Sequence, residues 1–380
     1  MREIETRQRG YYPTEIQTPL QYVADFALEA RRAKNRVWVQ CMDFEMGHAP
    51  GIVQNALAET GARGVDTRLT IDGFAVAMVN DQVSWIPKSG RRKDTQEYLQ
   101  RADKDMFARL ESSGVEVTVT NPHILNVFPA KIFPFVGRNH VKLTIVDDTA
   151  WFGGVNIASD HFEKADFMVK ITDPELVHAL GQVFFQVNED KPKKDYRIDV
   201  DARNAIYVDR GDRGKSIILD EAQRMLHRVH ESIDFISQFP PSATVLDAMV
   251  ERAKEGVDVH IITQSKRHLE SNSIPFGLLM KRNYQKFLKK TEGVSNVYVD
   301  HFEGHHGRVH AKMLIVDGRE ALWGSHNLDI AGVRAGTQEV DIKTTDLQLV
   351  RKLSAVFDQI KNGTFDLGFQ EGPFNPQEFK

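Results

Sequence analysis

The sequence has a single cysteine, no long apolar run and almost no excess charge. Because Cys41 is the only cysteine in 380 residues, no disulfide can form within the chain, which is usual in a reducing compartment. No stretch approaches the roughly 18 consecutive apolar residues of a membrane-spanning helix, and the first residues lack the apolar core of a signal peptide. The formal net charge of −4 does not indicate a surface coated with basic side chains for nucleic acid. These absences predict a cytoplasmic protein that does not span a membrane.

The length favours two domains, because 380 residues exceed what one typical hydrophobic core accommodates. An apolar content of 41% and a charged content of 27% are ordinary for a soluble globular protein. Residues 188–195 form a charged stretch with one proline, as linkers often do. We therefore predict an N-terminal domain over residues 1–190 and a C-terminal domain over residues 191–380.

One pattern, His-x-Lys-x4-Asp, occurs twice with a constant offset. The two copies are His140, Lys142 and Asp147 and, 170 residues later, His310, Lys312 and Asp317. A single copy is weak evidence for a site, but two copies in register indicate an internal duplication. Each copy is followed by a Gly-Gly-x-Asn or Gly-Ser-x-Asn segment, which ends at Asn156 or Asn327.

Both motifs lie in short β-branched, apolar runs, over residues 141–146 and 311–316, that predict strands. Residues two apart share one face of a strand, so each His points the same way as its Lys. Each Asp falls on the opposite face and opens a turn. After the turn, the returning strand brings Asn156 and Asn327 back beside the His-Lys pairs.

Two such units facing one another would bring two imidazoles and two ammonium groups to one point, which suits a phosphodiester. Lysine supplies positive charge for the non-bridging oxygens, and a His pair can divide nucleophilic attack and proton transfer. Amide, hydroxyl and backbone donors would bind the phosphate where charge develops. We expect these donors to include Asn156, Ser325 and Asn327.

These residues resemble the phospholipase D superfamily, whose members carry two His-x-Lys-x4-Asp motifs with the same Gly-rich segments. Residues 152–157 and 324–329 look most like those of bacterial cardiolipin synthases without transmembrane helices, and the resemblance covers most of the chain. It implies phosphatidyl transfer through a phosphohistidine, without cofactor or metal. The transfer would be cardiolipin synthesis from phosphatidylglycerol or hydrolysis of phospholipids.

The resemblance also implies roles for individual side chains. His140 would be the nucleophile, and His310 would act as acid and then as base. Acidic residues after each motif, Asp166 and Glu339, would accept a hydrogen bond from a catalytic imidazole, with Glu339 orienting His310.

Strand and helix patterns follow the same order in both halves. The first half predicts a helix over 18–34, a strand over 36–41, a helix near 50–61 and a strand over 64–72. The second half predicts a helix over 216–230, a strand over 233–236, a helix over 243–254 and a strand over 256–263. We therefore predict an α/β fold of two similar layered domains, each a mixed sheet flanked by helices. A pseudo-twofold axis would relate them, with the active site at their interface.

Three segments could contact a membrane surface, although buried packing or ordinary solvent exposure would also explain them. The apolar run 124–136 contains two prolines and could insert Phe133 and Phe135 among acyl chains. Two basic clusters could bind anionic headgroups. They are Lys88, Arg91, Arg92 and Lys93, and Lys281, Arg282, Lys286, Lys289 and Lys290.

Three alternatives remain. A non-enzymatic binding module would be expected to have lost a His or Lys from one motif, but both motifs are intact. Nucleases also belong to the superfamily, but the net charge makes nucleic acid an unlikely partner. A local cluster of His305, His306 and His310 suggests a metal, but no cysteine is near and the family pattern uses none. His161 and His326, next to the motif ends, are better placed than His305 and His306 to touch substrate. The sequence does not indicate an oligomeric state.

Overall fold

The structure, a computed structural model, describes most of the chain. The described residues are 14–73, 78–79, 82–83, 104–121, 137–187, 194–264, 274–302, 308–329, 333 and 336–367. The loop with Phe133 and Phe135, the first basic cluster, His305 and His306 lie outside these ranges. The predicted boundary near residue 190 also falls outside them and stays a prediction.

The first half folds around a mixed sheet of seven described strands in the order β1-β9-β8-β7-β2-β3-β6. The strands are β1 (Glu15–Gln17), β2 (Arg36–Cys41), β3 (Asp66–Asp72), β6 (Glu116–Thr120), β7 (Leu143–Val146), β8 (Thr149–Gly153) and β9 (Met168–Ile171). Its helices are α1 (Pro19–Arg32), α2 (His48–Ala62), a helix over 104–112 and α5 (Pro174–Gln186). A small separate pair, β4 (Met78–Val79) and β5 (Gln82–Val83), and the 3-10 segment η2 (Ser159–Glu163) complete this half.

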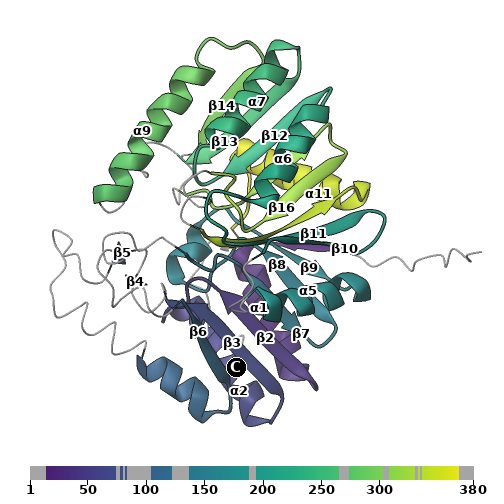
Figure 1. The fold of residues 1–380 in the computed structure, drawn as a ribbon. Helices are drawn as coiled ribbons and strands as arrows, with labels where there is room; N and C mark the ends of the chain where they lie inside the picture. The colour runs from purple at the N-terminus through teal and green to yellow at the C-terminus, as the bar shows by residue number, and fades with distance from the viewer. Residues whose placement is uncertain are drawn as a thin grey trace, which may run out of the picture.

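The second half repeats this arrangement in a sheet of eight described strands, ordered β10-β11-β17-β16-β15-β12-β13-β14. The strands are β10 (Tyr196–Asp199), β11 (Asn204–Arg210), β12 (Ser232–Ser237), β13 (Asp258–Gln264), β14 (Val297–Phe302), β15 (Met313–Val316), β16 (Glu320–Gly324) and β17 (Gln338–Thr344). Its helices are α6 (Ile217–Arg228), α7 (Ala243–Lys254), α9 (Ile274–Thr291) and α11 (Leu347–Lys361). The predicted layered α/β fold with two similar mixed sheets is confirmed (Figure 1).

Local sequence explains where the helices begin. Pro19 follows the N-cap residue Thr18, whose backbone N–H donates to the Gln21 side chain at 2.9 Å, and its ring suits the first helical turn. The helices that close the two halves start in the same way. The carboxylates of Asp173 and Asp346 each accept two backbone N–H groups at the starts of α5 and α11. The two closing helices are therefore equivalent elements of the repeat.

One hydrophobic core joins the halves. It contains side chains from α5, from α11 and from one face of each sheet. Trp323 of β16 lies fully buried there, with its ring centroid 5.4 Å from that of Phe152 on β8. Two further cores pack α1 and α2, or α6 and α7, on the other faces of the sheets. The halves are thus stacked through apolar contact, which holds their facing edges together.

Candidate active site

Each His-Lys pair lies in an extended segment just before a central strand of its sheet. Lys142 and Lys312 directly precede β7 and β15. Each strand therefore begins two residues later than predicted. Both lysine side chains are buried, and each Nζ donates to the backbone carbonyl of the His two residues earlier, His140 or His310. The predicted same-side placement of His and Lys is thereby supported by contacts within each motif.

The two motifs meet at a seam that obeys the twofold relation. The backbone N–H of His140 donates to the carbonyl of Gln338 at 2.9 Å, and that of His310 donates to the carbonyl of Ala165 at 2.9 Å. His310 stands 170 residues after His140, and Gln338 stands 173 after Ala165, so the two contacts occupy equivalent positions. Each motif is therefore hydrogen-bonded to the opposite half, at the start of β17 or shortly before β9.

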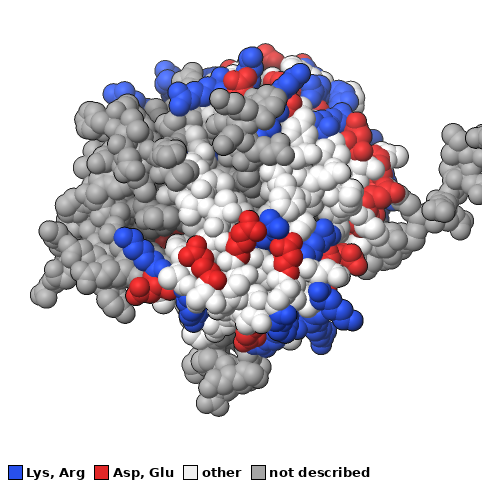
Figure 2. All heavy atoms as spheres, turned by 60° about the horizontal axis from the view of Figure 1, so that its bottom comes forward, with Lys and Arg blue, Asp and Glu red and all other residues white. Residues whose placement is uncertain are grey.

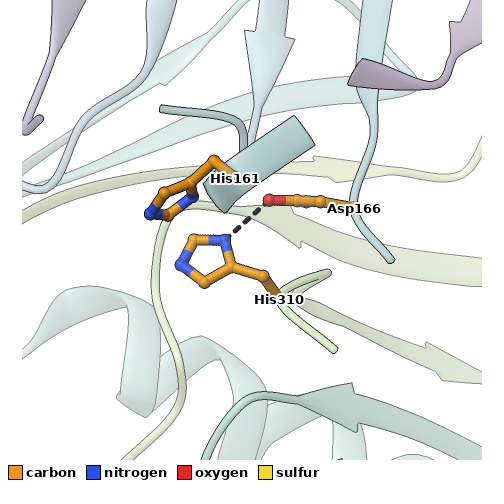
Figure 3. A group of neighbouring side chains, drawn as sticks. All are labelled: His161, Asp166 and His310. Carbon is orange, nitrogen blue, oxygen red and sulfur yellow. Dashed lines mark hydrogen bonds and ion pairs between the residues drawn. The ribbon is translucent and has the colours of Figure 1, made fainter. Parts of the chain in front are cut away.

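This seam decides which acid meets which histidine. His140 Nδ1 lies 3.0 Å from Glu339 Oε1, and His310 Nδ1 lies 2.6 Å from Asp166 Oδ2 (Figure 3). The expectation that Glu339 orients His310 is wrong. Each acid follows the residue that binds the backbone of the opposite motif, so the His-acid pairs cross between the halves.

The Gly-Gly and Gly-Ser segments support these acids differently. The Ser325 hydroxyl donates to Glu339 Oε2 at 2.6 Å, so in this structure its proton points at the acid, and its contact with a phosphate stays a prediction. A Cβ on Gly154 would lie only 2.3 Å from Asp166 Oδ1. The carboxylate of Asp166 occupies the space of that missing side chain and accepts the N–H of Phe167 at 2.9 Å.

The two predicted asparagines are buried beside the motifs, each held by its own half. Asn156 Oδ1 accepts the backbone N–H of Asp43 at 3.3 Å, and its Nδ2 lies 3.4 Å from Nε2 of His161. Asn327 Oδ1 accepts from the Ser237 hydroxyl at 3.2 Å. In both, the amide oxygen is engaged, and Asn156 Nδ2 also faces His161, so phosphate binding by the remaining amide N–H groups stays a prediction.

Asp147 and Asp317, expected with the catalytic residues, contact the backbone. Their φ angles are 46° and 52°, in the left-handed region that Asp tolerates in turns. Asp147 accepts the N–H groups of residues 34–36, and Asp317 accepts those of residues 230–232. Both carboxylates tie the motif hairpin to the adjacent strand, which agrees with their predicted orientation away from the His-Lys face.

Burial shapes the protonation of the site. It lowers the pKa values of Lys142 and Lys312 and raises that of Asp166. Burial, followed by the charge of Lys312, lowers the pKa of His310 well below its ordinary value. Burial acts to raise the pKa of Glu339, but His140, His326 and Lys142 together outweigh this and the pKa is lowered. Glu339 is thus ionised, and His310 is neutral before substrate binds.

Three side chains could be considered for a metal. His161, Asp166 and His310 each offer one ligand atom, and these atoms lie within 4.8 Å of one another. However, Lys312 Nζ lies 3.0 Å from the same His310 nitrogen that contacts Asp166. A buried ammonium at that distance would repel a dication, so the cluster fits a hydrogen-bonded His-Asp pair better than a metal.

Sequence reasoning placed His161 and His326 near substrate but missed Lys164. All three are buried. Lys164 Nζ lies 2.9 Å from Asp160 Oδ2, and Arg308 Nη1 from the second half lies 3.5 Å from the same oxygen. The segment around η2 has neither strand nor helix periodicity, so no sequence signal marks it as part of the site.

The fold and site define a phospholipase D-like protein with two paired motifs. The family described as "Cardiolipin synthase, PLD-like domain" matches residues 29–187 and 223–361. The chain therefore belongs to this family. It is similar to a cardiolipin synthase of Listeria innocua, with 26% identity over 67% of this chain and 54% of that protein. A probable cardiolipin synthase of Bacillus subtilis shows 24% identity over 69% of this chain and 52% of its own length. The chain thus spans about half the length of these relatives.

Solved structures share the fold. The crystal structure of a phosphatidylserine synthase from Haemophilus influenzae aligns with a TM-score of 0.68 at 16% identity, covering 92% of this chain and 86% of that one. A polyphosphate kinase from Porphyromonas gingivalis aligns with a TM-score of 0.55 at 10% identity, covering 96% of this chain and 53% of that one. Among the described residues, no helix is long and apolar enough to span a bilayer.

Proposed function

We propose that the protein transfers a phosphatidyl group from a phospholipid to an acceptor hydroxyl through a phosphohistidine, as in cardiolipin synthesis. The observation that carries this proposal is the crossed arrangement of His140 with Glu339 and His310 with Asp166 at 3.0 and 2.6 Å. An acid on Nδ1 fixes the ring and leaves Nε2 of each imidazole for phosphorus or a proton.

The transfer proceeds in two displacements. Nε2 of His140 attacks phosphorus while the P–O bond to the leaving alcohol breaks, and His310 gives that alcohol its proton. His310 then takes the proton of the acceptor hydroxyl, whose oxygen attacks phosphorus and releases His140. His140 is the nucleophile by family resemblance, and its side chain is 19% exposed against 5% for His310, so it is the more accessible to substrate.

Substrate binding itself would prepare His310 as an acid. Lys312 and Lys142 are among the groups that lower the pKa of His310. A phosphodiester carries one negative charge, which would offset these ammonium groups when it binds between them. The pKa of His310 then rises, and the ring takes up the proton that it must deliver.

A phospholipid substrate would require contact with a membrane surface. The described basic cluster lies on α9, where Arg282, Lys286, Lys289 and Lys290 are exposed, while Tyr284 and Phe287 are buried against the protein. Such a helix can present cations to anionic headgroups. We propose α9 as one membrane contact, together with the predicted loop of Phe133 and Phe135.

A nuclease of the same superfamily is the alternative. On the face shown in Figure 2, Lys and Arg side chains of the described residues are interspersed with Asp and Glu. A single strand of nucleic acid would favour a continuous basic track with stacking aromatics. The described residues do not form such a track on this face.

The test is product analysis. Purified protein is incubated with vesicles of phosphatidylglycerol, with vesicles of phosphatidylcholine and with single-stranded DNA, and the products are identified by mass. Cardiolipin or a transphosphatidylated product supports the proposal, phosphatidic acid alone makes water the acceptor, and cleavage of DNA alone refutes it.

The first prediction concerns the two histidines. His140→Ala and His310→Ala should each reduce turnover by at least about 10²-fold, because each removes one half of a nucleophile-acid pair. Labelled substrate quenched in alkali should leave the label on the peptide that contains His140. Label on the His310 peptide would reverse the assignment.

A further inference from the structure

A third histidine lies against the crossed His310–Asp166 pair. His161 belongs to η2 of the first half, and its ring centroid is 4.7 Å from that of His310 with an interplanar angle of 85° (Figure 3). This is an edge-to-face contact between buried rings. A ring packed edge-on restricts rotation of the His310 imidazole, so it helps to keep Nδ1 on Asp166.

The same side chain reaches the first half's asparagine. His161 Nε2 lies 3.4 Å from Asn156 Nδ2, a long contact. The amide orientation follows from the other end of the group, because Asn156 Oδ1 accepts the backbone N–H of Asp43 at 3.3 Å. Asn156 Nδ2 is therefore the donor, so in the neutral form of the ring His161 Nε2 accepts and Nδ1 carries the proton. In the second half, Asn327 is held by Ser237 instead.

We infer that His161 is a positioning residue for the proposed transfer, holding the His310 ring and the Asn156 amide with one side chain. The kinetic part of this inference rests on the proposed function, whereas the contacts are independent of it. His161 ties a proton-transfer group to a phosphate donor, so both are placed together when substrate enters.

The charges around His310 provide a readout that packing alone would not change. The groups that face it are Asp166, Lys312, His161, Lys164 and Lys142. Among these, the charge of a protonated His161 is one of the causes that lower the pKa of His310, after burial and Lys312. Loss of the His161 imidazole should therefore raise the titration midpoint of His310.

Two variants separate the two contacts. His161→Phe keeps a ring against His310 but cannot accept from Asn156, whereas His161→Gln keeps an acceptor near the place of Nε2 but has no ring. His178→Ala is the matched control, since His178 is exposed on α5 and its Nε2 lies 3.2 Å from Gln182 Nε2. Kinetics use bis(p-nitrophenyl) phosphate as the soluble probe. The His310 midpoint is measured by histidine ¹⁵N NMR, and its resonance is assigned by its loss in His310→Ala.

We expect His161→Gln to lower kcat by roughly 10- to 100-fold with little change in KM, because the His310 ring loses its support. We expect His161→Phe to raise KM more than it lowers kcat, because Asn156 loses its partner. Both variants should raise the His310 midpoint, while His178→Ala leaves all three quantities unchanged. Thermal unfolding identifies a variant that fails to fold. In that case the other variant alone tests the inference.

Wild-type kcat, KM and His310 midpoint in the folded variants would overturn the inference and leave His161 as packing. Failure of the proposed function looks different. The wild-type protein would then turn over none of the phosphodiesters offered, while the shift in the His310 midpoint would still show whether His161 acts on that ring.

Discussion

At the scale of single residues, the clearest departure from twofold repetition is that the first half has Gly154 at the position where the second half has Ser325. Ser325 donates to Glu339, whereas Gly154 leaves room for the carboxylate of Asp166. Asp is one methylene shorter than Glu, so its carboxylate lies closer to its own backbone and directly against the chain at Gly154. Interchanging the two small residues is therefore not neutral, although the sequence motif accepts either.

Gly154→Ala should fold but lose about 10²-fold in activity, because its Cβ would force the Asp166 carboxylate away from His310. Ser325→Ala should cost less, since it removes the hydrogen bonds of one hydroxyl, to Glu339 and to the backbone of Val340, and creates no clash. Turnover of a soluble phosphodiester, with circular dichroism as the folding control, checks both. Equal losses in the two variants would mean that the space at Gly154 is unimportant.

At the scale of elements, the motif aspartates connect the hairpin to its neighbour. Burial acts to raise the pKa of Asp147, but the backbone N–H groups of residues 34–36 outweigh this and lower it. A carboxylate with a lowered pKa stabilises the fold above its unfolded pKa, and this stabilisation is lost as pH falls through the folded value. The effect should therefore be fully present at neutral pH and disappear only as the pH falls below about 4.

Asp147→Asn should lower the free energy of unfolding by about 1–2 kcal/mol at pH 7, since an amide keeps one acceptor oxygen but loses the other. Activity of the folded variant should remain, because the side chain does not face the histidines. Urea denaturation measures the loss, and the exposed neighbour Asp148→Asn is the control. A stable but inactive Asp147→Asn would show that this residue acts in the chemistry.

The paired strands β11 and β17 place two buried acidic residues opposite each other behind the site. Asp209 lies opposite Glu339 in the register and is buried. Burial, followed by the charge of Asp195, raises its pKa to about 7. An Asp with a raised folded pKa destabilises the protein increasingly as pH rises from the unfolded value of about 4 towards 7.

Asp209→Asn should therefore stabilise the protein, with a gain that grows between about pH 4 and 7 and then levels off. Asn keeps an acceptor for the backbone N–H of Gly211, which donates to Asp209 Oδ1 at 2.8 Å. Thermal midpoints measured against pH for both proteins check this. A pH-independent difference would mean that the carboxyl does not titrate in this range.

The sequence predicted the helices and strands of each half better than the contacts between the two halves. The helix predicted near 50–61 is α2 (His48–Ala62), and the strand predicted over 36–41 is β2 with the same limits. Periodicity carries this information because it is local. The pairing of Glu339 with His140 depends on backbone contacts across the seam, which no local pattern records. His161 likewise entered only as a neighbour of the motif, because its short 3-10 segment has no periodicity.

At the scale of the whole molecule, the shared core makes the active site depend on contact between the halves. Trp323 packs against Phe152 and Phe167 of the first half, at centroid distances of 5.4 and 6.4 Å. Trp151 is equally buried but packs within the first half, beside Tyr22. Substituting either tryptophan therefore removes an equally buried ring, from the contact between the halves for Trp323 and from the interior of the first half for Trp151.

Trp323→Ala and Trp151→Ala should each cost about 3–5 kcal/mol of stability, since both leave a large cavity. Only Trp323→Ala should also loosen the seam, so that the N–H groups of His140 and His310, which bind Gln338 and Ala165, exchange faster with solvent. Hydrogen exchange with mass spectrometry, done where both variants are folded, measures this. The activity of Trp323→Ala should therefore fall more than its loss of stability alone explains. Equal exchange at the seam in the two variants would show that the halves are held together by something other than this core.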